Sequence, residues 1–493
     1  MRMRVLLINA PPHQIVERMY DTPEFTRLSL ATLAGFIRPH GHTVACIDAK
    51  FERLNYDDVV ARAKEFKPDL VGLTAFTNEV KPAARVAALI KKAIPGVKTI
   101  LGGVHMTAIP ERSMDEFGMF DFGGIGEGEQ TLLDLITVLE KNGDLHDVDG
   151  LIWRDAAHGG TVVKNKPRMD IGDQDSIPMP AWDLMPAGRE YTVMTARGCP
   201  YSCQFCMNPN GRVVRKRSAK AFVDEIEWIV NHTKAERLFM CDEIFSVDMK
   251  RTHAILDDMI ARGLNKRLKW FAQTHVNFVD EELFRKMKQA GAYMVGFGIE
   301  TGDLDKLQYL NKGIRSWDKI LQARNAAKRA KLAVEAYFII GQPNETYASA
   351  KNTIRLATEV NPELPIFGIM VPYPGTEVAN MAERGEGGFR IKSYDWDDYN
   401  KQIGDALEFK GLTRRQLEKL QLFGYLSVFV KNWRFMDLTR FVWRFRREGF
   451  VFLRKFLFKK MSFLNSEAPS LPAQDPKKSE ELAYFPEHHT SHR

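Results

Sequence analysis

The chain has 493 residues, 44% of them hydrophobic, and a formal net charge of +7. That length predicts about three domains with sizeable cores. Ten Lys or Arg residues and two acids lie in residues 431–460, a local charge of +8, so the rest of the chain sums to 7 − 8 = −1. A positive charge confined to one segment excludes a chain that is basic throughout, and we expect no nucleic-acid partner.

The cysteine content excludes a disulfide-stabilised secreted fold. Five cysteines are an odd number in a long chain, and the first residues show no signal-peptide pattern. No uncharged apolar run reaches the ~18 residues that span a bilayer. We therefore expect a cytoplasmic protein in a reducing compartment. Cys46 and Cys241 lie in apolar, strand-like runs and are expected to be ordinary buried residues.

Residues 1–145 alternate apolar strands with amphipathic helices. The expected strands are Val5–Asn9, Thr43–Asp48, Leu70–Ala75, Lys98–Leu101 and Phe120–Gly123. The expected helices are Leu30–Arg38, Asp57–Phe66, Val80–Ala93 and Glu129–Lys141. This alternation predicts βαβ units and an α/β fold with a doubly wound parallel sheet.

Polar and glycine-rich loops follow these strands. A doubly wound sheet binds its ligand outside the carboxyl ends of the strands, and glycine there lets a bulky ligand approach the backbone. We expect ligand contacts from Asn9, Thr74, Gly102, Gly103, His105, Gly126 and Glu127. The first strand is not followed by G-x-G-x-x-G, so a nicotinamide site is not expected.

Residues 146–190 are expected to link two domains. Gly150–Arg154 and Thr161–Val163 flank a Gly-Gly turn and predict a β-hairpin. The run Ile177–Trp182 is rich in proline and predicts an extended crossing between the domains.

Residues 191–380 resume the alternation of strands and helices. The expected strands are Tyr191–Thr195, Arg237–Cys241, Lys269–His275, Tyr293–Ile299, Val334–Ile340 and Ile366–Val371. The expected helices are Ala219–Asn231 with Ser218 as its N-cap, Lys250–Arg262, Glu281–Gln289, Trp317–Ala330 and Ala348–Glu359. Six strands predict a partial (β/α)6 barrel rather than a closed barrel of eight.

Three cysteines in one short loop are the strongest chemical signal. Cys199, Cys203 and Cys206 follow the first barrel strand with the spacing C-x3-C-x2-C, at the strand end where barrel active sites lie. Three thiolates can hold three irons of a cubane cluster, which leaves the fourth iron without a protein ligand. Structural zinc is the alternative, but it needs four ligands, and the nearest histidines, His158 and His232, lie well outside the loop.

The cysteine loop, with Phe205 before its last cysteine, resembles that of the radical SAM superfamily. The strand-end segments that resemble, in order, those of radical SAM enzymes with a cobalamin-binding domain are Cys241–Phe245, Gln273–His275, Gly296–Gly302, Gly341–Thr346 and Pro372–Thr376. The resemblance covers most of residues 1–380. It implies a [4Fe–4S] cluster on the three cysteines and S-adenosylmethionine (SAM) contacts from Phe205, Glu300 and Gly341.

The first domain resembles the cobalamin-binding domain of these enzymes in its opening Leu-Ile-Asn-Ala-Pro-Pro and in the loops Gly102–His105 and Gly126–Glu129. The resemblance implies that the strand-end residues named above hold cobalamin. The D-x-H-x-x-G signature that gives cobalt a histidine ligand is absent, which implies cobalamin without such a ligand. His105 is the candidate substitute, since imidazole suits the metal. A domain that keeps this fold but has lost its corrin is the alternative.

The end of the chain changes character. Residues 381–465 are expected to be mostly helical. Within them, residues 431–463 interleave aromatic and basic side chains, which predicts an interfacial helix at the inner face of an anionic membrane. A helix packed against the barrel is the alternative. Residues 466–493 are polar and proline-containing, and we expect them to be disordered.

The resemblance implies an enzyme that cleaves SAM to a 5′-deoxyadenosyl radical and, with cobalamin, methylates an unactivated carbon. The implied partners are a small-molecule substrate, hydrophobic if it comes from a membrane, and a flavodoxin- or ferredoxin-type reductant. Cyclising or rearranging chemistry, as in the anaerobic magnesium-protoporphyrin ester cyclases, is the first alternative. A non-enzymatic iron–sulfur protein is the second. A tRNA methylthiotransferase fits less well, because Cys46 alone cannot supply that family's second cluster.

Overall fold

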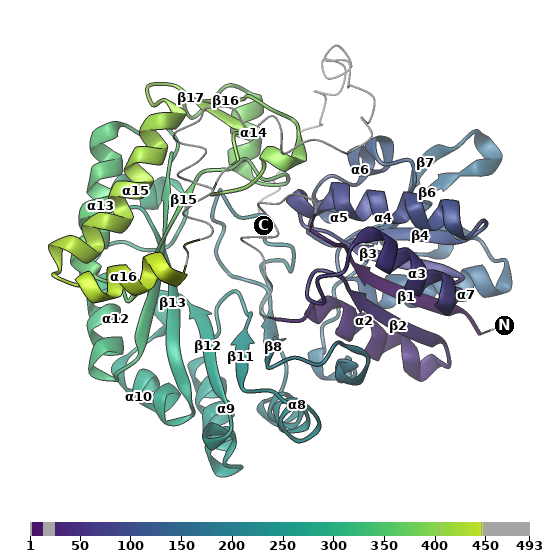
Figure 1. The fold of residues 1–493 in the computed structure, drawn as a ribbon, viewed down its shortest axis with the longest axis horizontal. Coiled ribbons are helices and arrows are strands. Elements are labelled where there is room, and N and C mark those ends of the chain that lie inside the picture. The colour runs from purple at the N-terminus through teal and green to yellow at the C-terminus, as the bar shows by residue number, and fades with distance from the viewer. Residues whose placement is uncertain (1, 13–24, 403, 445, 447–493) are drawn as a thin grey trace, which may run out of the picture.

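The fold was obtained as a computed structural model that describes residues 2–12, 25–402, 404–444 and 446. Two α/β units lie side by side, one built on a seven-stranded sheet and the other on a six-stranded sheet (Figure 1). This arrangement confirms the predicted succession of a doubly wound unit and a barrel-like unit.

The first sheet has the strand order β2-β1-β3-β4-β5-β6-β7. Its strands are β1 (Arg4–Asn9), β2 (Thr43–Asp48), β3 (Leu70–Thr74), β4 (Lys98–Gly102), β5 (Phe122–Gly124), β6 (Leu151–Asp155) and β7 (Thr161–Lys164). The strands from β1 to β5 are parallel. The strand order reverses between β1 and β3, and such a switch point is where doubly wound sheets bind ligands.

The predicted hairpin forms, but it does not stand in a separate linker. β6 pairs antiparallel with β5, and β7 pairs antiparallel with β6, so the hairpin is the edge of the first sheet. Residues 146–190 are therefore a linker only after β7. Sequence periodicity finds a hairpin but does not say to which sheet its edge pairs.

Helices cover both faces of the first sheet, as a doubly wound fold requires. They are α2 (Leu28–Ile37), α3 (Tyr56–Phe66), α4 (Val80–Ala93), α5 (Val104–Ala108), α6 (Pro110–Glu116) and α7 (Gly128–Lys141). Asn55 begins α3 with a capping box that it shares with Asp58, so two backbone N–H groups at that end are satisfied. The buried residues of α4 recur at helical spacing, which fixes the face that it presents to the sheet.

The second sheet has the order β15-β14-β13-β12-β11-β8, with every pair parallel. Its strands are β8 (Glu190–Val193), β11 (Arg237–Met240), β12 (Lys269–Thr274), β13 (Ala292–Glu300), β14 (Ala333–Ile340) and β15 (Leu364–Ile369). Spatial order follows chain order, and β8 and β15 lie at opposite edges. The sheet is thus the open, partial barrel that the sequence predicts.

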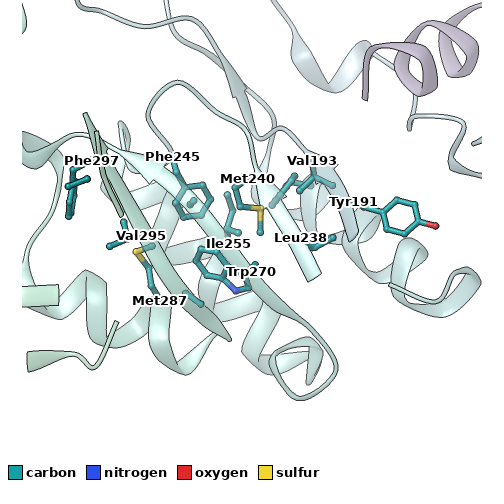
Figure 2. Packing of buried hydrophobic residues seen from close by; sticks show 14 of the residues in the cluster. Tyr191, Val193, Leu238, Met240, Phe245, Ile255, Trp270, Met287, Val295 and Phe297 are labelled. Carbon is teal, nitrogen blue, oxygen red and sulfur yellow. The ribbon is translucent and has the colours of Figure 1, made fainter. Parts of the chain in front are cut away.

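Helices α8 (Ala219–His232), α9 (Met249–Ala261), α10 (Glu281–Gln289), α12 (Trp317–Arg329) and α13 (Tyr347–Val360) pack outside this sheet (Figure 1). Ser218 caps α8 as predicted, since its side chain accepts the Ala221 N–H. Figure 2 shows the core beneath the strands, where Trp270, Met287 and Ile255 belong to one buried hydrophobic cluster. Full burial of a side chain such as Met287 contributes about 1.5–3 kcal/mol.

The C-terminal region is helical, as predicted, but two short strands precede its last two helices. Its elements are α14 (Glu377–Glu383), β16 (Phe389–Ile391), η9 (Trp396–Asp398), β17 (Leu407–Phe409), α15 (Arg414–Lys431) and α16 (Phe435–Arg444). β16 and β17 form an antiparallel ribbon that the prediction missed, because three-residue strands give almost no periodic signal. Residues 447–463 of the predicted interfacial segment, and the whole tail 466–493, lie outside the described residues. Among the described helices, none is long and apolar enough to cross a membrane.

Residues 393–402, which we call the strap, run from the ribbon across to the first unit. The Trp396 indole is buried there, and its Nε1–H donates to Glu116 Oε1 at 2.8 Å. Lys81 of α4 forms ion pairs with Asp395 and Asp397 at either side of the indole. The strap therefore joins the end of the chain to its first unit.

Candidate active site between the two sheets

A cavity of about 800 Å³ opens between the two units. One wall is formed by the carboxyl ends of the first sheet, and the other includes Thr192, Met194, Phe239 and Cys241 of the second unit. Its volume lies within the range of ligand and cofactor sites. The predicted ligand contacts that line it are Asn9, Thr74, Gly102, Gly103, Gly126 and Glu127.

Two glycines shape the first wall of the cavity. Gly103 has φ +95°, and a Cβ on it would lie 2.8 Å from the Ala75 carbonyl oxygen, so no larger residue fits the turn after β4. Gly126 has φ +78°, and a Cβ there would meet no atom within 4 Å. A side chain at residue 126 would project into space that the wall leaves open. This bare, glycine-lined wall fits a large planar group such as a corrin.

His105 does not line the cavity with the other predicted residues. Its ring is fully buried, packs against Phe117 and Trp396, and forms a 3.3 Å contact between Nδ1 and Thr77 Oγ1. Burial and, secondarily, Arg112 lower the pKa of His105 to about 3, so the imidazole is neutral. His105 lies in α5, and its side chain packs among these rings outside the cavity lining, so its position does not support a role as cobalt ligand.

The cysteine loop begins at a short antiparallel pair formed by β9 (Ala196–Arg197) and β10 (Arg215–Lys216). Gly198 has φ +98°, and a Cβ on it would collide with the Val213 carbonyl, so glycine is required before Cys199. The Cys199 N–H donates to the Gly211 carbonyl, and the Cys206 N–H donates to the Cys203 carbonyl, both at 3.0 Å. The loop is thus folded by its own backbone.

The thiols of this loop have the chemistry that an iron–sulfur cluster needs. Burial raises the pKa of all three, to about 11 for Cys203, while the Lys312 ammonium acts in the opposite direction. Within the described residues, no three Cys, His, Asp or Glu side chains converge on one metal ion. A cubane takes one thiolate on each of three irons, so it needs no such convergence. The donor set fits such a cluster.

Glu300 lies at the carboxyl end of β13, beside the cysteine loop. A bulge separates it from Gly298, and its φ of 68° is strained for a residue with a side chain. Such strain costs about 1–3 kcal/mol and is concentrated at functional sites. Its carboxylate is buried and accepts a hydrogen bond from Lys312 Nζ at 2.7 Å. The predicted SAM-binding carboxylate is therefore held by a lysine whose side chain is 12% exposed.

Sequence reasoning missed Lys312. Its ammonium lies 5.7 Å from the Phe205 ring centroid as well as against Glu300. Burial alone would lower the pKa of Lys312, but Glu300, with help from Cys203, outweighs that effect and raises it. The charge is therefore kept beside the cysteine loop. A lone lysine between two helices gives no periodic signal, and only its contact with Glu300 reveals it.

A group of aromatic and amide side chains holds the turn that carries Lys312. The His275 ring lies over Tyr201 with a centroid distance of 4.4 Å, and its Nε2 is 3.0 Å from the Lys312 carbonyl. Asn277 donates to both the Tyr201 hydroxyl and the Gly313 carbonyl. The lysine, the cysteine loop and the end of β12 are thus fixed to one another.

Gly341 ends β14 at the same edge as Glu300. It has φ +84°, and a Cβ there would lie 2.7 Å from the Phe409 ring. Its N–H and that of Gln342 both donate to Glu345, and burial raises the pKa of that carboxyl to about 7. Phe205 packs with Phe409 around a small cluster at the ribbon. Glu300 and Gly341 therefore lie at the ends of neighbouring strands, and Phe205 of the cysteine loop contacts Lys312, the partner of Glu300.

Comparison with known proteins assigns the two units. The B12 binding domain family matches residues 6–136, and the Radical SAM superfamily matches residues 193–357. An uncharacterized methyltransferase, PH0819, of Pyrococcus horikoshii is 31% identical over 87% of this chain and 93% of its own length. The chain belongs to the cobalamin-binding radical SAM family. This confirms the resemblance seen in the sequence.

Other relatives differ in their named reactions. The anaerobic magnesium-protoporphyrin IX monomethyl ester cyclase of Cereibacter sphaeroides is 28% identical over 87% of this chain and 69% of its own length. Among solved structures, the radical SAM methyltransferase TsrM of Kitasatospora setae superimposes with a TM-score of 0.70 at 18% identity, over 86% of this chain and 91% of that one. The cobalamin-dependent S-adenosylmethionine radical enzyme OxsB superimposes with a TM-score of 0.72 at 19% identity, over 94% of this chain and 73% of that one.

Family membership establishes a radical SAM enzyme whose cofactors are a [4Fe–4S] cluster, SAM and cobalamin. The glycine-lined wall and the three-thiol loop fit these groups, as argued above from their geometry. The individual contacts predicted for Phe205, Glu300, Gly341 and the strand-end residues of the first sheet remain predictions.

Proposed function

We propose that the protein transfers a methyl group from SAM to a carbon atom of a small molecule bound in the interdomain cavity. One observation carries the proposal. The cavity is lined on one side by the strand ends of the B12-binding unit and on the other by the radical SAM unit, including Arg197, Pro209 and Asn210 beside the cysteine loop. A substrate there would face both cofactor sites at once.

The residues have separate tasks in this proposal. Cys199, Cys203 and Cys206 hold the cluster. Glu300 accepts hydrogen bonds from the amino or ribose groups of SAM. The positive charge of Lys312, which already lies beside Glu300, attracts the carboxylate of SAM. The wall against which cobalamin binds is formed by Asn9, Thr74, Gly102, Gly103 and Gly126. When bound, these cofactors supply a one-electron reductant of SAM, a substrate radical and a methyl donor.

Cyclisation or rearrangement is the second candidate, because a magnesium-protoporphyrin ester cyclase is among the relatives. SAM carrying a deuterated methyl group separates the two reactions. Both reactions release 5′-deoxyadenosine. Methyl transfer places the label in the product, whereas the second candidate leaves the product unlabelled. A non-enzymatic iron–sulfur protein forms no 5′-deoxyadenosine under anaerobic, reducing conditions. A Cys203→Ala variant is the matched control and should form none.

The electron donor in this proposal is a flavodoxin- or ferredoxin-type protein of the cytoplasm. Cys206 is the exposed cysteine of the three, which supports electron entry from outside the loop. Reduction of the loaded enzyme by purified flavodoxin or ferredoxin, followed by electron paramagnetic resonance, tests this directly. Absence of a reduced-cluster signal with both proteins, and its presence with dithionite, would contradict the proposal.

We further propose that the end of the chain contacts an anionic membrane surface and that the substrate is hydrophobic. The large apolar side chains exposed on α15, α16 and the turn between them are Leu422, Phe423, Leu426, Val430, Trp433, Phe435, Met436, Val442 and Trp443. Lys431 and Arg440 are exposed among them. Apolar side chains flanked by cations are typical of interfacial helices.

Relatives with hydrophobic substrates in their names agree with this proposal. They include the bacteriochlorophyllide d C-8(2)-methyltransferase of Chlorobaculum tepidum and the hopanoid C-3 methylase of Methylococcus capsulatus. Sedimentation with anionic vesicles at low salt tests the contact, with neutral vesicles as the control. Binding should weaken as salt rises, since the Debye length falls to about 3 Å at 1 M. No binding at low salt would overturn it.

A further inference from the structure

Glu127 makes more contacts than a residue that simply lines a cavity. Its Oε1 accepts hydrogen bonds from Arg197 Nη1 and from Arg215 Nη1, each at 2.8 Å. Its Oε2 accepts the backbone N–H of Ile171, also at 2.8 Å. The side chains of Glu127, Arg197 and Arg215 are 6%, 15% and 7% exposed. Both carboxylate oxygens are thus already used inside the protein.

A second carboxylate completes this cluster. Glu129 accepts from Arg197 Nη2 at 2.5 Å, so the two arms of one guanidinium meet two glutamates. Arg215 also donates to the carbonyl groups of Asn210 and Ile171. Burial would raise the pKa of Glu127, but Arg197 outweighs it and holds the pKa below its usual value. Buried charges are tolerated where, as here, they are paired with opposite charges and hydrogen-bonded.

The two arginines stand at the base of the cysteine loop. Arg197 lies two residues before Cys199, and Arg215 pairs with it across the β9–β10 ribbon. Glu127 is the N-cap residue of α7 and Glu129 lies in the first turn of that helix, and both line the cavity wall in the first unit. A single carboxylate therefore touches both strands from which the cysteine loop emerges. The planar, rigid guanidinium fork makes such a contact directional.

We propose that Glu127 is a positioning residue: it fixes the cysteine loop against the cavity wall of the first unit and so sets the separation of the cluster site from the cobalamin site. The sequence predicted Glu127 as a direct cobalamin contact. Its two oxygens are instead occupied by three donors from the linker and the second unit. The inference concerns the geometry of the two sites and holds whether the reaction is methylation or cyclisation.

Hydrogen exchange of the cofactor-free, full-length chain tests the proposal without any catalytic readout. In Glu127→Gln, amide exchange in residues 199–211 should rise about tenfold or more, because one hydrogen bond to a charged group contributes enough to account for that factor. Glu281→Gln is the matched control, since Glu281 forms exposed ion pairs with Arg285 and Arg329 far from this loop. It should leave exchange in residues 199–211 unchanged.

A second measurement separates positioning from simple stabilisation. In the loaded protein, the magnetic interaction between Co(II) cobalamin and the reduced cluster should change in Glu127→Gln and stay as in the wild type in Glu281→Gln. If Glu127→Gln does not fold, Arg197→Lys keeps the charge, loses the fork and should give the same two changes. Unchanged exchange and unchanged magnetic interaction would overturn the proposal. Loss of cobalamin with unchanged loop exchange would also overturn it, in favour of a direct contact.

Discussion

The indole of Trp396 packs edge-on against the imidazole of His105, with ring centroids 4.9 Å apart. Trp396 belongs to the strap in the C-terminal region, and His105 to α5, which follows β4 in the first unit. The Arg112 guanidinium lies 4.4 Å from the centroid of the same indole. This contact couples the C-terminal region to the domain that holds the cavity wall. Its loss should therefore lower the stability of the first unit.

Trp396→Ala should lower the free energy of unfolding by about 3–5 kcal/mol, the usual cost of deleting a buried tryptophan. Trp433→Ala is the matched control, because that indole is 82% exposed and should change stability by less than about 0.5 kcal/mol. Urea unfolding followed by circular dichroism measures both. Equal effects of the two substitutions would show that the strap does not support the first unit.

The lowered pKa of His105 should be visible in the pH dependence of the free energy of unfolding. Its pKa is about 3 in the folded chain and about 6.5 when unfolded. Between these values the unfolded state binds one proton more than the folded state, so stability falls as pH is lowered from 6.5 towards 3. The slope contributed is about 1.4 kcal/mol per pH unit and vanishes above pH 6.5. His105→Gln should remove this slope, whereas His146→Gln, at an exposed site, should keep it. Identical pH profiles for wild type and His105→Gln would contradict the assignment.

The sequence predicted the scaffold well because the scaffold follows from periodicity. The five parallel strands of the first sheet and the six strands of the second were each expected near their observed ends, since apolar strands alternate with amphipathic helices. The cysteine loop was found because spacing alone defines it. The ribbon β16–β17 and the pairing of β6 with β5 were not, because tertiary pairing leaves little local signal.

The direction in which a side chain points could not be predicted from the sequence either. Gly103 and His105 are two residues apart at the start of α5, yet one lines the cavity and the other packs against Trp396. Lys312 and Glu300 are 12 residues apart, and only the bulge in β13 and the turn at Gly313 bring their charges together. Motifs identify which loops matter, but the fold decides which atoms of a loop face the site.

Each of the three loop cysteines should be needed for one cluster. Anaerobic reconstitution should give about four irons and four sulfides per chain, as a single cubane requires. Cys199→Ala, Cys203→Ala or Cys206→Ala should each abolish both the cluster absorbance and SAM cleavage. Cys46→Ala, at a site where burial raises the pKa of the thiol to about 12, is the control and should retain a full cluster. A full cluster in the triple variant would refute the assignment.

Lys312→Met should weaken SAM binding to the reconstituted protein. The variant keeps the bulk of the side chain but leaves Glu300 without its ion-pair partner and removes a positive charge beside the cysteine loop. Loss of a charged hydrogen bond costs about 1.5–3 kcal/mol, which corresponds to a roughly 10- to 100-fold rise in Kd. Lys351→Met, at an exposed lysine on α13, is the control. Calorimetric titration with SAM measures both, and an unchanged Kd in Lys312→Met would remove Lys312 from the site.

Two glycines with similar positive φ angles allow the effect of a side chain on cobalamin binding to be separated from the effect of backbone strain. Gly126 and Gly96 have φ of +78° and +88°, and a Cβ on either would meet no atom within 4 Å. A leucine at each should therefore cost a similar strain, about 1–2 kcal/mol. Gly126 lines the cavity, whereas Gly96 lies in the turn between α4 and β4. Gly126→Leu should reduce the cobalamin retained after reconstitution by about tenfold or more, because its side chain fills the space beside the wall, and Gly96→Leu should retain the wild-type amount. Corrin absorbance per chain is the measurement. Equal retention in the two variants would show that cobalamin does not bind against this wall.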